Sequence, residues 1–242
     1  MKKCITAVLF SLIAGALLGL GTSARAADFP MAGLVFHVSA GRVEVKDGVV
    51  EQLTDLSGKH NHAQHDRAPK CVLTNPVVVK DAANGQPVLR FSGAHSSFTF
   101  NEITNIRTIF WVVSKDAQAF KQKQELFVLG GSKSLDFHPG THFTDTILHA
   151  TTKYGSPALQ LGKAWLNGKA MDARQTDFPQ VLSVITLEAT TNVRANQIAK
   201  DRQFPDRCWH GDIAEILLFD TTLTDNDRQA VEKYLLTKYG IH

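Results

Sequence analysis

Short apolar runs recur along the chain and are separated by Gly, Pro, Asn, Asp and Ser, a pattern that indicates β-strands joined by turns. The strongest runs lie at 31–40, 108–114, 181–188 and 211–220. The run at 108–114 is the most apolar, so it is predicted to lie at the centre of a sheet, where both faces are buried.

Weaker runs complete the pattern. Two short strands are expected within 43–53, around the hairpin signal Asp47-Gly48, and a turn at Asn84-Gly85 precedes a strand at 86–93. Asn167-Gly168 is another hairpin signal. Residues 64–76 read as a surface loop. Further short strands are expected at 97–100, 125–130, 135–137, 146–149, 158–161 and 165–167.

The end of the chain predicts a strand followed by a helix. After the strand at 211–220, Thr224 can cap a helix, and Asp225 and Asp227 fall in its first turn, where the helix dipole favours carboxylates. Gly240 follows the last apolar residue, where a left-handed C-cap is expected. Many short strands with one terminal helix predict an all-β fold, a two-sheet antiparallel sandwich with a short C-terminal α-helix.

The first 26 residues read as a signal peptide. Lys2 and Lys3 precede an apolar stretch, and Ala24-Arg-Ala26 supplies a cleavage site, so we expect a secreted or periplasmic domain spanning 27–242. No second apolar run approaches the roughly 18 residues that a membrane span needs. The leader contains three basic residues and no acid, so Lys plus Arg falls from 26 to 23 and equals the 23 Asp plus Glu residues. A near-neutral domain gives no indication of nucleic-acid binding.

Two cysteines remain after the leader, Cys71 and Cys208, in separate parts of the domain. Outside the cytoplasm, two lone thiols often form a disulfide. Two small buried thiols are the alternative, and the sequence leaves both open.

Four blocks, at 34–40, 53–63, 84–93 and 211–220, occur in an order that resembles the secreted LamG-like jelly-roll domains of bacteria. These domains belong to the concanavalin A-like lectin/glucanase superfamily. The resemblance implies a jelly-roll sandwich of two curved antiparallel sheets. It implies function less directly, since this fold carries lectins, adhesion modules, glucanases and scaffolds. The chain departs from the family pattern near His37, where a Trp and an Asp are common.

The residues within these blocks read as structural. Asp55 and Ser57 are expected to tie a turn, and Gly58 to relieve a backbone constraint. Arg90 is expected to pair with Glu215 or another acid.

Catalysis of the superfamily type requires two carboxylates about 5–5.5 Å apart on one strand face. Asp212 and Glu215 are three residues apart, so a regular strand sends them to opposite faces. A cleavage site would need acids brought together by folding, such as Asp136 and Glu188. The chain also lacks the Gly-x-Ser-x-Gly pattern of serine hydrolases.

Polar and aromatic residues supply the candidates for ligand and metal binding. His60, His62 and His65 form one loop cluster, and His138 and His142 a second, but neither has a recognised metal-ligand spacing. Calcium is possible, with oxygens from Asp55, Asn61 and Asp66. Trp111 is predicted to be core, whereas Trp165 and Trp209 either stack on a sugar ring or close the sandwich.

The leading hypothesis is a secreted, non-catalytic module that binds carbohydrate or a glycosylated surface partner, with Trp165, Trp209, His138 and His142 as candidate ligand contacts. It predicts that the two tryptophans are exposed. The first alternative is a structural or adhesion protein that binds another protein through a sheet face. The second is a glycan-cleaving enzyme.

Overall fold

A computed structural model of the chain describes residues 29–66, 75–93, 97–122, 127–140, 144–202 and 207–242. These residues form three helices, α1 (Ala117–Gln122), α2 (Pro157–Gln160) and α3 (Asp225–Tyr239). They also form twelve strands: β1 (Leu34–Ser39), β2 (Val43–Lys46), β3 (Val49–Leu53), β4 (Ala63–His65), β5 (Val77–Ala83), β6 (Gln86–Ser92), β7 (Phe98–Lys115), β8 (Leu129–Gly130), β9 (Lys163–Leu166), β10 (Lys169–Met171), β11 (Ser183–Ile198) and β12 (His210–Phe219). No helix among them is both long and apolar enough to cross a bilayer.

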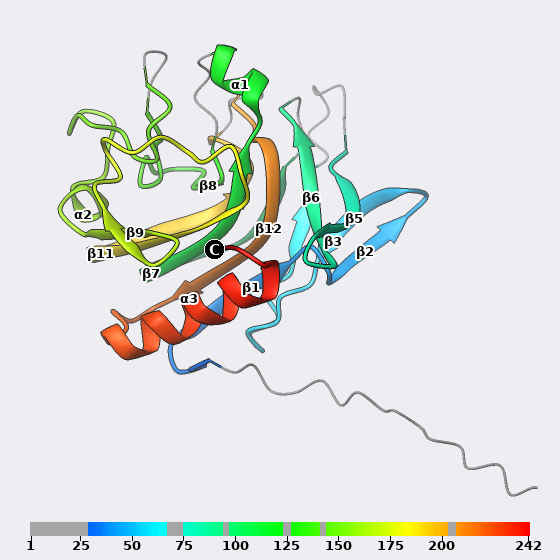
Figure 1. Cartoon of the computed structure of the whole chain (residues 1–242), viewed down its shortest axis with the longest axis horizontal. Coiled ribbons are helices and arrows are strands. Elements are labelled where there is room, and N and C mark those ends of the chain that lie inside the picture. Colours follow the sequence, from blue (N-terminus) through cyan, green and yellow to red (C-terminus); the bar gives the residue numbers. More distant parts are fainter. Residues whose placement is uncertain (1–28, 67–74, 94–96, 123–126, 141–143, 203–206) are drawn as a thin grey trace, which may run out of the picture.

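The named strands pair antiparallel in two layers that share their longest members. One layer has the order β10-β9-β11-β7-β12-β6-β5, and β1 pairs with the part of β12 beyond β6. The other layer joins β2, β3 and β4 to the start of β7, and β8 to the end of β11. Because β7 and β11 run through both, the two layers are parts of one continuous folded sheet (Figure 1). The predicted all-β antiparallel sandwich with a C-terminal helix is confirmed.

Two apolar cores hold this arrangement together. Along β7, Ile109, Trp111 and Val113 face the core between the layers, while Phe110 and Val112 face the core under α3. β7 pairs with β11 on one side and β12 on the other. The prediction that 108–114 lies at the centre of a sheet is therefore confirmed.

Local signals for turns and caps are also confirmed. Thr224 caps α3 by accepting the N–H of Asp227, and Gly240 ends the helix with φ 63°. Both residues of the Asp47-Gly48 turn have positive φ, as do both of Asn167-Gly168, which is the geometry of tight hairpin turns.

Several predicted boundaries were wrong. The strands at 97–100 and 108–114 are one strand, β7, and the strand at 181–188 continues as β11 to Ile198. The predicted loop at 64–76 contains the end of β4, and β5 was not predicted. In the middle region, 158–161 falls largely on helix α2, while 135–137 and 146–149 form no named strand.

Candidate functional site

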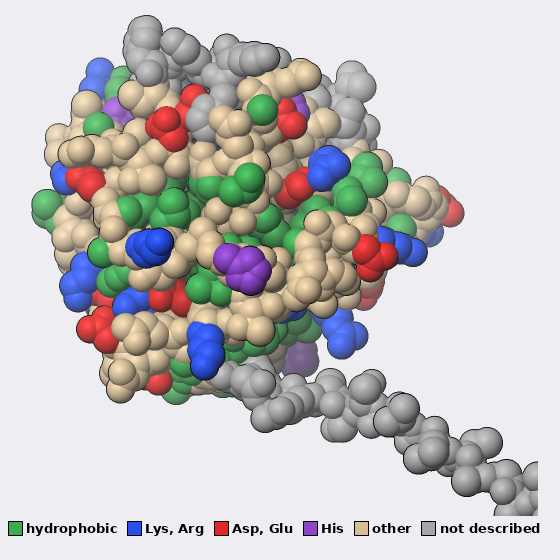
Figure 2. Space-filling view, viewed as in Figure 1, with side chains coloured by type: hydrophobic (Ala, Val, Ile, Leu, Met, Phe, Trp, Pro, Cys, Tyr) green, Lys and Arg blue, Asp and Glu red, His purple; other side chains and the backbone are tan. Residues whose placement is uncertain are grey.

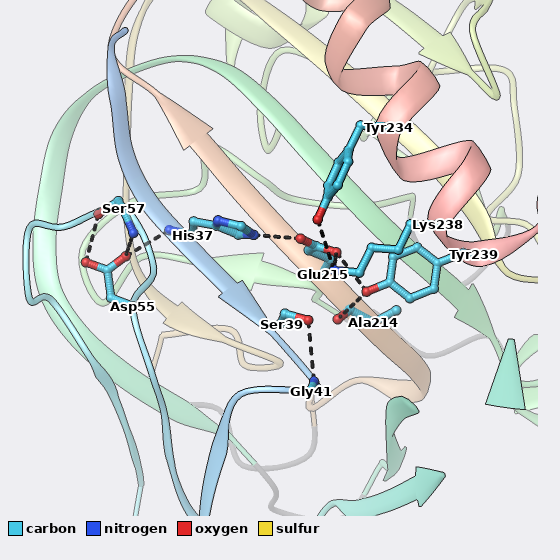
Figure 3. A network of polar contacts seen from close by, with 10 residues as sticks. All are labelled: His37, Ser39, Gly41, Asp55, Ser57, Ala214, Glu215, Tyr234, Lys238 and Tyr239. Atoms are coloured by element: carbon cyan, nitrogen blue, oxygen red, sulfur yellow. Dashed lines mark hydrogen bonds and ion pairs between the residues drawn. The ribbon is translucent and has the colours of Figure 1, made fainter. Parts of the chain in front are cut away.

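A buried carboxylate, Glu215 on β12, is the centre of a polar network that joins β1, β12 and α3 (Figure 3). Its side chain is 0% exposed, and its Oε1 lies 2.6 Å from Nε2 of His37 on β1. Its Oε2 accepts hydrogen bonds from Lys238 Nζ and Tyr239 Oη on α3, both at 2.7 Å. Both carboxylate oxygens are therefore paired, as a buried charge requires.

This network shifts the ionisation of its members. Burial by itself raises the pKa of Glu215, but the hydrogen bond from His37 and the charge of Lys238 outweigh it, so the pKa lies below its ordinary value. Burial lowers the pKa of Lys238, but the adjacent Glu215 carboxylate outweighs burial and raises it overall. Burial, reinforced by Glu215, raises the pKa of Tyr239. The network has a structural role, because Glu215 at its centre is fully buried and cannot contact a ligand.

The predicted turn at Asp55 is tied to the same strand. Asp55 Oδ1 accepts the N–H groups of His37 and Ser57, both at 3.0 Å, and Oδ2 accepts Ser57 Oγ at 2.8 Å and the Asn61 N–H at 3.0 Å. Gly58 has φ 82°, in the left-handed region that favours glycine. The structural interpretation of Asp55, Ser57 and Gly58 is confirmed.

These contacts do not fit the calcium site considered at Asp55, Asn61 and Asp66. Both Asp55 oxygens hold the turn, and Asn61 Oδ1 accepts the N–H of Asn101 at 2.8 Å. Asp66 pairs with Lys200. Among the described residues, no three His, Cys, Asp or Glu side chains are arranged to hold a metal ion. The candidate oxygens instead join the loops to neighbouring segments.

A β-bulge in β12 changes which face its acids occupy. Ile213 and Ile216, three residues apart, both contact the core between the layers, which regular alternation does not allow. The pairing with β7 shifts between Ile213 and Glu215, where the extra residue is accommodated. Asp212 and Glu215 therefore lie on the same face, the one that α3 packs on. The prediction of opposite faces was wrong because it assumed an unbroken strand.

Beyond the C-terminal end of α3, the same outer face of the sheet carries two rows of polar side chains. Each row crosses β6, β12 and β7. In the first row, Asp212 is paired in register with Arg90 on β6 and Ser114 on β7. In the second, His210 is opposite Ser92, and its carbonyl accepts the N–H of Asp116 at 3.0 Å. We call these residues the polar array: Arg90, Ser92, Ser114, Asp116, His210 and Asp212. All six line one groove with a volume of about 480 Å³.

One ion pair and one helix cap hold residues of the array in place. Arg90 Nε and Nη2 donate to the two carboxylate oxygens of Asp212 at 2.8 and 2.9 Å. Arg90 was expected to pair with Glu215 or another acid, and its partner is Asp212, whereas Glu215 pairs with His37, Lys238 and Tyr239. His210 Nε2 lies 3.8 Å from Asp116 Oδ1, which also accepts the Gln118 N–H at 2.7 Å in the first turn of α1.

The candidate tryptophans are buried. Trp165 is 8% exposed, and the Arg228 guanidinium lies 4.1 Å from the centre of its ring. Trp209 is 0% exposed, and its ring centre is 5.0 Å from that of Phe178. The expectation that both rings are exposed was wrong, because they fill the protein interior and offer no face for a sugar. Trp111 is core, as predicted.

Of the two candidate histidines, only His138 lies among the described residues. His138 is buried, with Nδ1 2.8 Å from the Pro139 carbonyl oxygen, and its ring lies beside those of His149 and Tyr154. Tyr154 is 41% exposed and was not among the predicted ligand contacts. His142 lies outside the described residues.

The remaining predicted pairs stay without support. Cys208 is buried, but Cys71 lies outside the described residues, so their disulfide stays a prediction. Asp136 accepts the N–H of Arg194 on β11, six residues beyond Glu188. That separation is roughly 20 Å along a strand, so the structure gives no sign that these acids converge.

Comparison with known proteins gives no relative from which a function could be transferred. No protein-family model matches the chain, and no curated protein matches its sequence. The LamG-like resemblance therefore rests on the four sequence blocks, to which the structure adds an all-β fold.

Sequence reasoning missed the polar array, although a signal for it exists. Each of the three strands carries two polar residues at i and i+2 near one end, which places both on one face. These pairs are Arg90 with Ser92, His210 with Asp212, and Ser114 with Asp116. The register of β6, β12 and β7, which aligns these pairs, could not be predicted from the sequence.

Proposed function

We propose that this protein is a secreted module that binds carbohydrate in the groove over the polar array. The observation that carries the proposal is the groove itself, where charged and hydroxyl side chains from three adjacent strands share one open face. Secretion is proposed from the leader-like first 26 residues.

The array matches the chemistry of a sugar. A guanidinium has five N–H donors and a carboxylate about four acceptor positions, and Arg90 and Asp212 use two of each on one another. The planar pair can therefore donate to and accept from adjacent hydroxyls, each of which is itself a donor and an acceptor. Ser114 completes this row from β7, but its side chain is buried, so Arg90 and Asp212 carry the proposed contacts.

A protein-binding sheet face has less support. Among the described residues, the exposed large apolar side chains are dispersed over separate segments: Met31, Val45, Val77, Tyr154, Leu161 and Val181. On the face shown in Figure 2, acidic and basic side chains are interspersed. A contiguous apolar patch, the usual mark of a protein-binding face, is therefore not what these residues form.

Cleavage of glycosidic bonds is also less well supported than binding. It requires one carboxylic acid that donates a proton and a second carboxylate. In the array, both oxygens of Asp212 accept hydrogen bonds from Arg90. This pairing favours the ionised carboxylate, which accepts hydrogen bonds from sugar hydroxyls but cannot donate the proton that cleavage needs.

A glycan-array screen of the domain 27–242, followed by titration calorimetry with the best ligand, tests the proposal. Asp212→Asn and Arg90→Ala should each weaken binding about tenfold or more, because each removes a charge-assisted hydrogen bond worth roughly 1.5–3 kcal/mol. Chelation of calcium should leave binding unchanged, since the candidate calcium oxygens hold loops together.

The matched control is Arg174→Ala. Arg174 forms the same two-point pair with Asp172, at 2.9 and 2.8 Å, but outside the groove. Its loss should leave glycan affinity unchanged. A blank screen from folded protein, or equal losses in the control and groove variants, would refute the proposal.

A further inference from the structure

The second row of the polar array places a hydroxyl, an imidazole and a carboxylate side by side. Ser92 on β6 and His210 on β12 are opposite one another in register. Opposite residues in an antiparallel pair have Cβ atoms roughly 4.5–5.5 Å apart, so the two side chains are neighbours on the outer face. On the other side, His210 Nε2 lies 3.8 Å from Asp116 Oδ1. Ser-His-Asp hydrolases on unrelated folds use the same order of groups, with the imidazole turned the other way, so that Nδ1 there faces the Asp.

Gly93 allows the His210 ring to lie close to β6. A Cβ at this glycine would be 3.2 Å from Cβ of His210 and 3.4 Å from its Nδ1. The Nδ1 edge of the ring is thus next to the backbone that follows Ser92, while Nε2 faces Asp116. With Nε2 facing a carboxylate, Nδ1 is the nitrogen left to take a proton from a hydroxyl on β6.

The row is also accessible. Ser92 is exposed, and the side chains of His210 and Asp116 are 23% and 44% exposed. All three line the groove, so a ligand held there can reach them.

We propose that Ser92 and His210, positioned by Asp116, hydrolyse esters. Ser92 Oγ bonds to the ester carbonyl carbon as its proton passes to Nδ1 of His210. The bond from that carbon to the alcohol oxygen then breaks, and the departing oxygen takes the proton from His210. Water attacks the acyl group on Ser92 and gives its proton to His210, which returns one to Ser92 Oγ as the carboxylic acid leaves. Asp116 stabilises the imidazolium formed in each half.

The substrate class is an O-acylated carbohydrate, a choice that rests on the proposed function. Arg90 and Asp212 in the first row would hold the sugar hydroxyls. The two rows are two residues apart along each strand, roughly 7 Å, which accommodates a sugar ring in one row and its acyl group in the other.

Two probes that contain no sugar test the catalytic step in the domain 27–242. One is the activated ester p-nitrophenyl acetate, and the other is a fluorophosphonate, which bonds covalently to activated serines. We expect saturable hydrolysis, and a fluorophosphonate adduct that peptide mapping places on Ser92. Ser92→Ala should lower kcat/KM at least about 10²-fold, as for loss of a positioned catalytic group. The exposed Ser132→Ala is the control and should retain full activity.

Two further variants separate catalysis from structure. His210→Ala should be inactive but partly restored by free imidazole, which a purely structural histidine would not show. Asp116→Asn should lower kcat with KM unchanged, while the Asn still accepts the N–H at the start of α1. Circular dichroism confirms that each variant is folded.

Full activity in folded Ser92→Ala, or an adduct on another serine, would overturn the inference. Ester hydrolysis and glycan binding are measured in separate assays, so either proposal can be refuted without the other. If the glycan screen is blank but Ser92 hydrolyses esters, the proposal of carbohydrate binding is refuted. If glycans bind but Ser92 forms no adduct, only the proposal of ester hydrolysis is refuted.

Discussion

Glu215 is a carboxylate that is 0% exposed and held by His37, Lys238 and Tyr239. A buried ion pair is weak evidence of net stability, because removing two charges from water costs about as much as their attraction returns. Removing one partner is different, since the other charge is left buried. Glu215→Gln should therefore lower the free energy of unfolding by roughly 3 kcal/mol at neutral pH.

The pKa shifts in this network predict how stability depends on pH. The pKa of Glu215 is lowered from 4.5, so below about pH 4.5 the unfolded chain binds a proton before the folded chain does, and stability falls as pH falls. The pKa values of Lys238 and Tyr239 are raised from 10.5 and 10.0, so above about pH 10 the unfolded chain loses protons first, and stability falls as pH rises. Stability should be greatest between these limits.

Urea denaturation of wild type and Glu215→Gln from pH 3 to 11 measures both effects. The variant should lose much of the decline on the acid side, because it has no carboxyl to protonate. Glu102→Gln is the control, since the Glu102–Arg194 pair is long at 3.9 Å and partly exposed, and should change stability by less than about 0.5 kcal/mol. An acid decline that is identical in wild type and Glu215→Gln would assign it to other groups.

At the scale of elements, α3 is held both by its packing and by its ends. Thr224 Oγ1 accepts the Asp227 N–H at 3.2 Å and donates to the Asp227 carboxylate at 2.8 Å, so its hydroxyl is held in the capping position. Thr224→Ala should lower the free energy of unfolding by about 1 kcal/mol, measured by urea denaturation, and Thr224→Ser should restore it. Equal stability of the Ala and Ser variants would show that the cap is not used.

Elements specified by local chemistry could be predicted, and those specified by distant pairing could not. The ends of α3 and the Asp-Gly and Asn-Gly turns are local features, and the structure has them where they were expected. The middle of β7 reads as polar because residues such as Glu102 and Asn105 face solvent, yet Ile103 and Ile106 are buried and pair with β11. Its partner stretch is equally polar, so neither resembles a strand alone.

The candidate site follows the same rule. The types of residue in the polar array, and their spacing by two along each strand, are visible in the sequence. Their assembly depends on the register of β6, β12 and β7, which brings together residues about 100 positions apart in the sequence. The bulge before Glu215, which puts Glu215 on the same face as Asp212, breaks the alternation from which the two faces were predicted.

At the scale of the whole molecule, the core between the layers determines what the tryptophans can do. Trp209, next to the start of β12, packs on Phe178, which also stacks near Trp111 of β7, so these rings link the loop before β11 to the central strands. A ring in this position contributes packing, and its removal leaves a cavity between the layers.

Trp209→Ala therefore separates the two roles considered for this residue. A sugar-stacking ring would lose affinity with stability unchanged, whereas a core ring should lower the free energy of unfolding by about 3–5 kcal/mol. We expect the second result in urea denaturation, with glycan affinity unchanged at temperatures where the variant is folded, because the array lies on the opposite face of the sheet. Trp209→Phe, which keeps an aromatic ring, should recover part of the loss. A stable Trp209→Ala protein with weakened glycan binding would contradict both the core assignment and the location of the groove site.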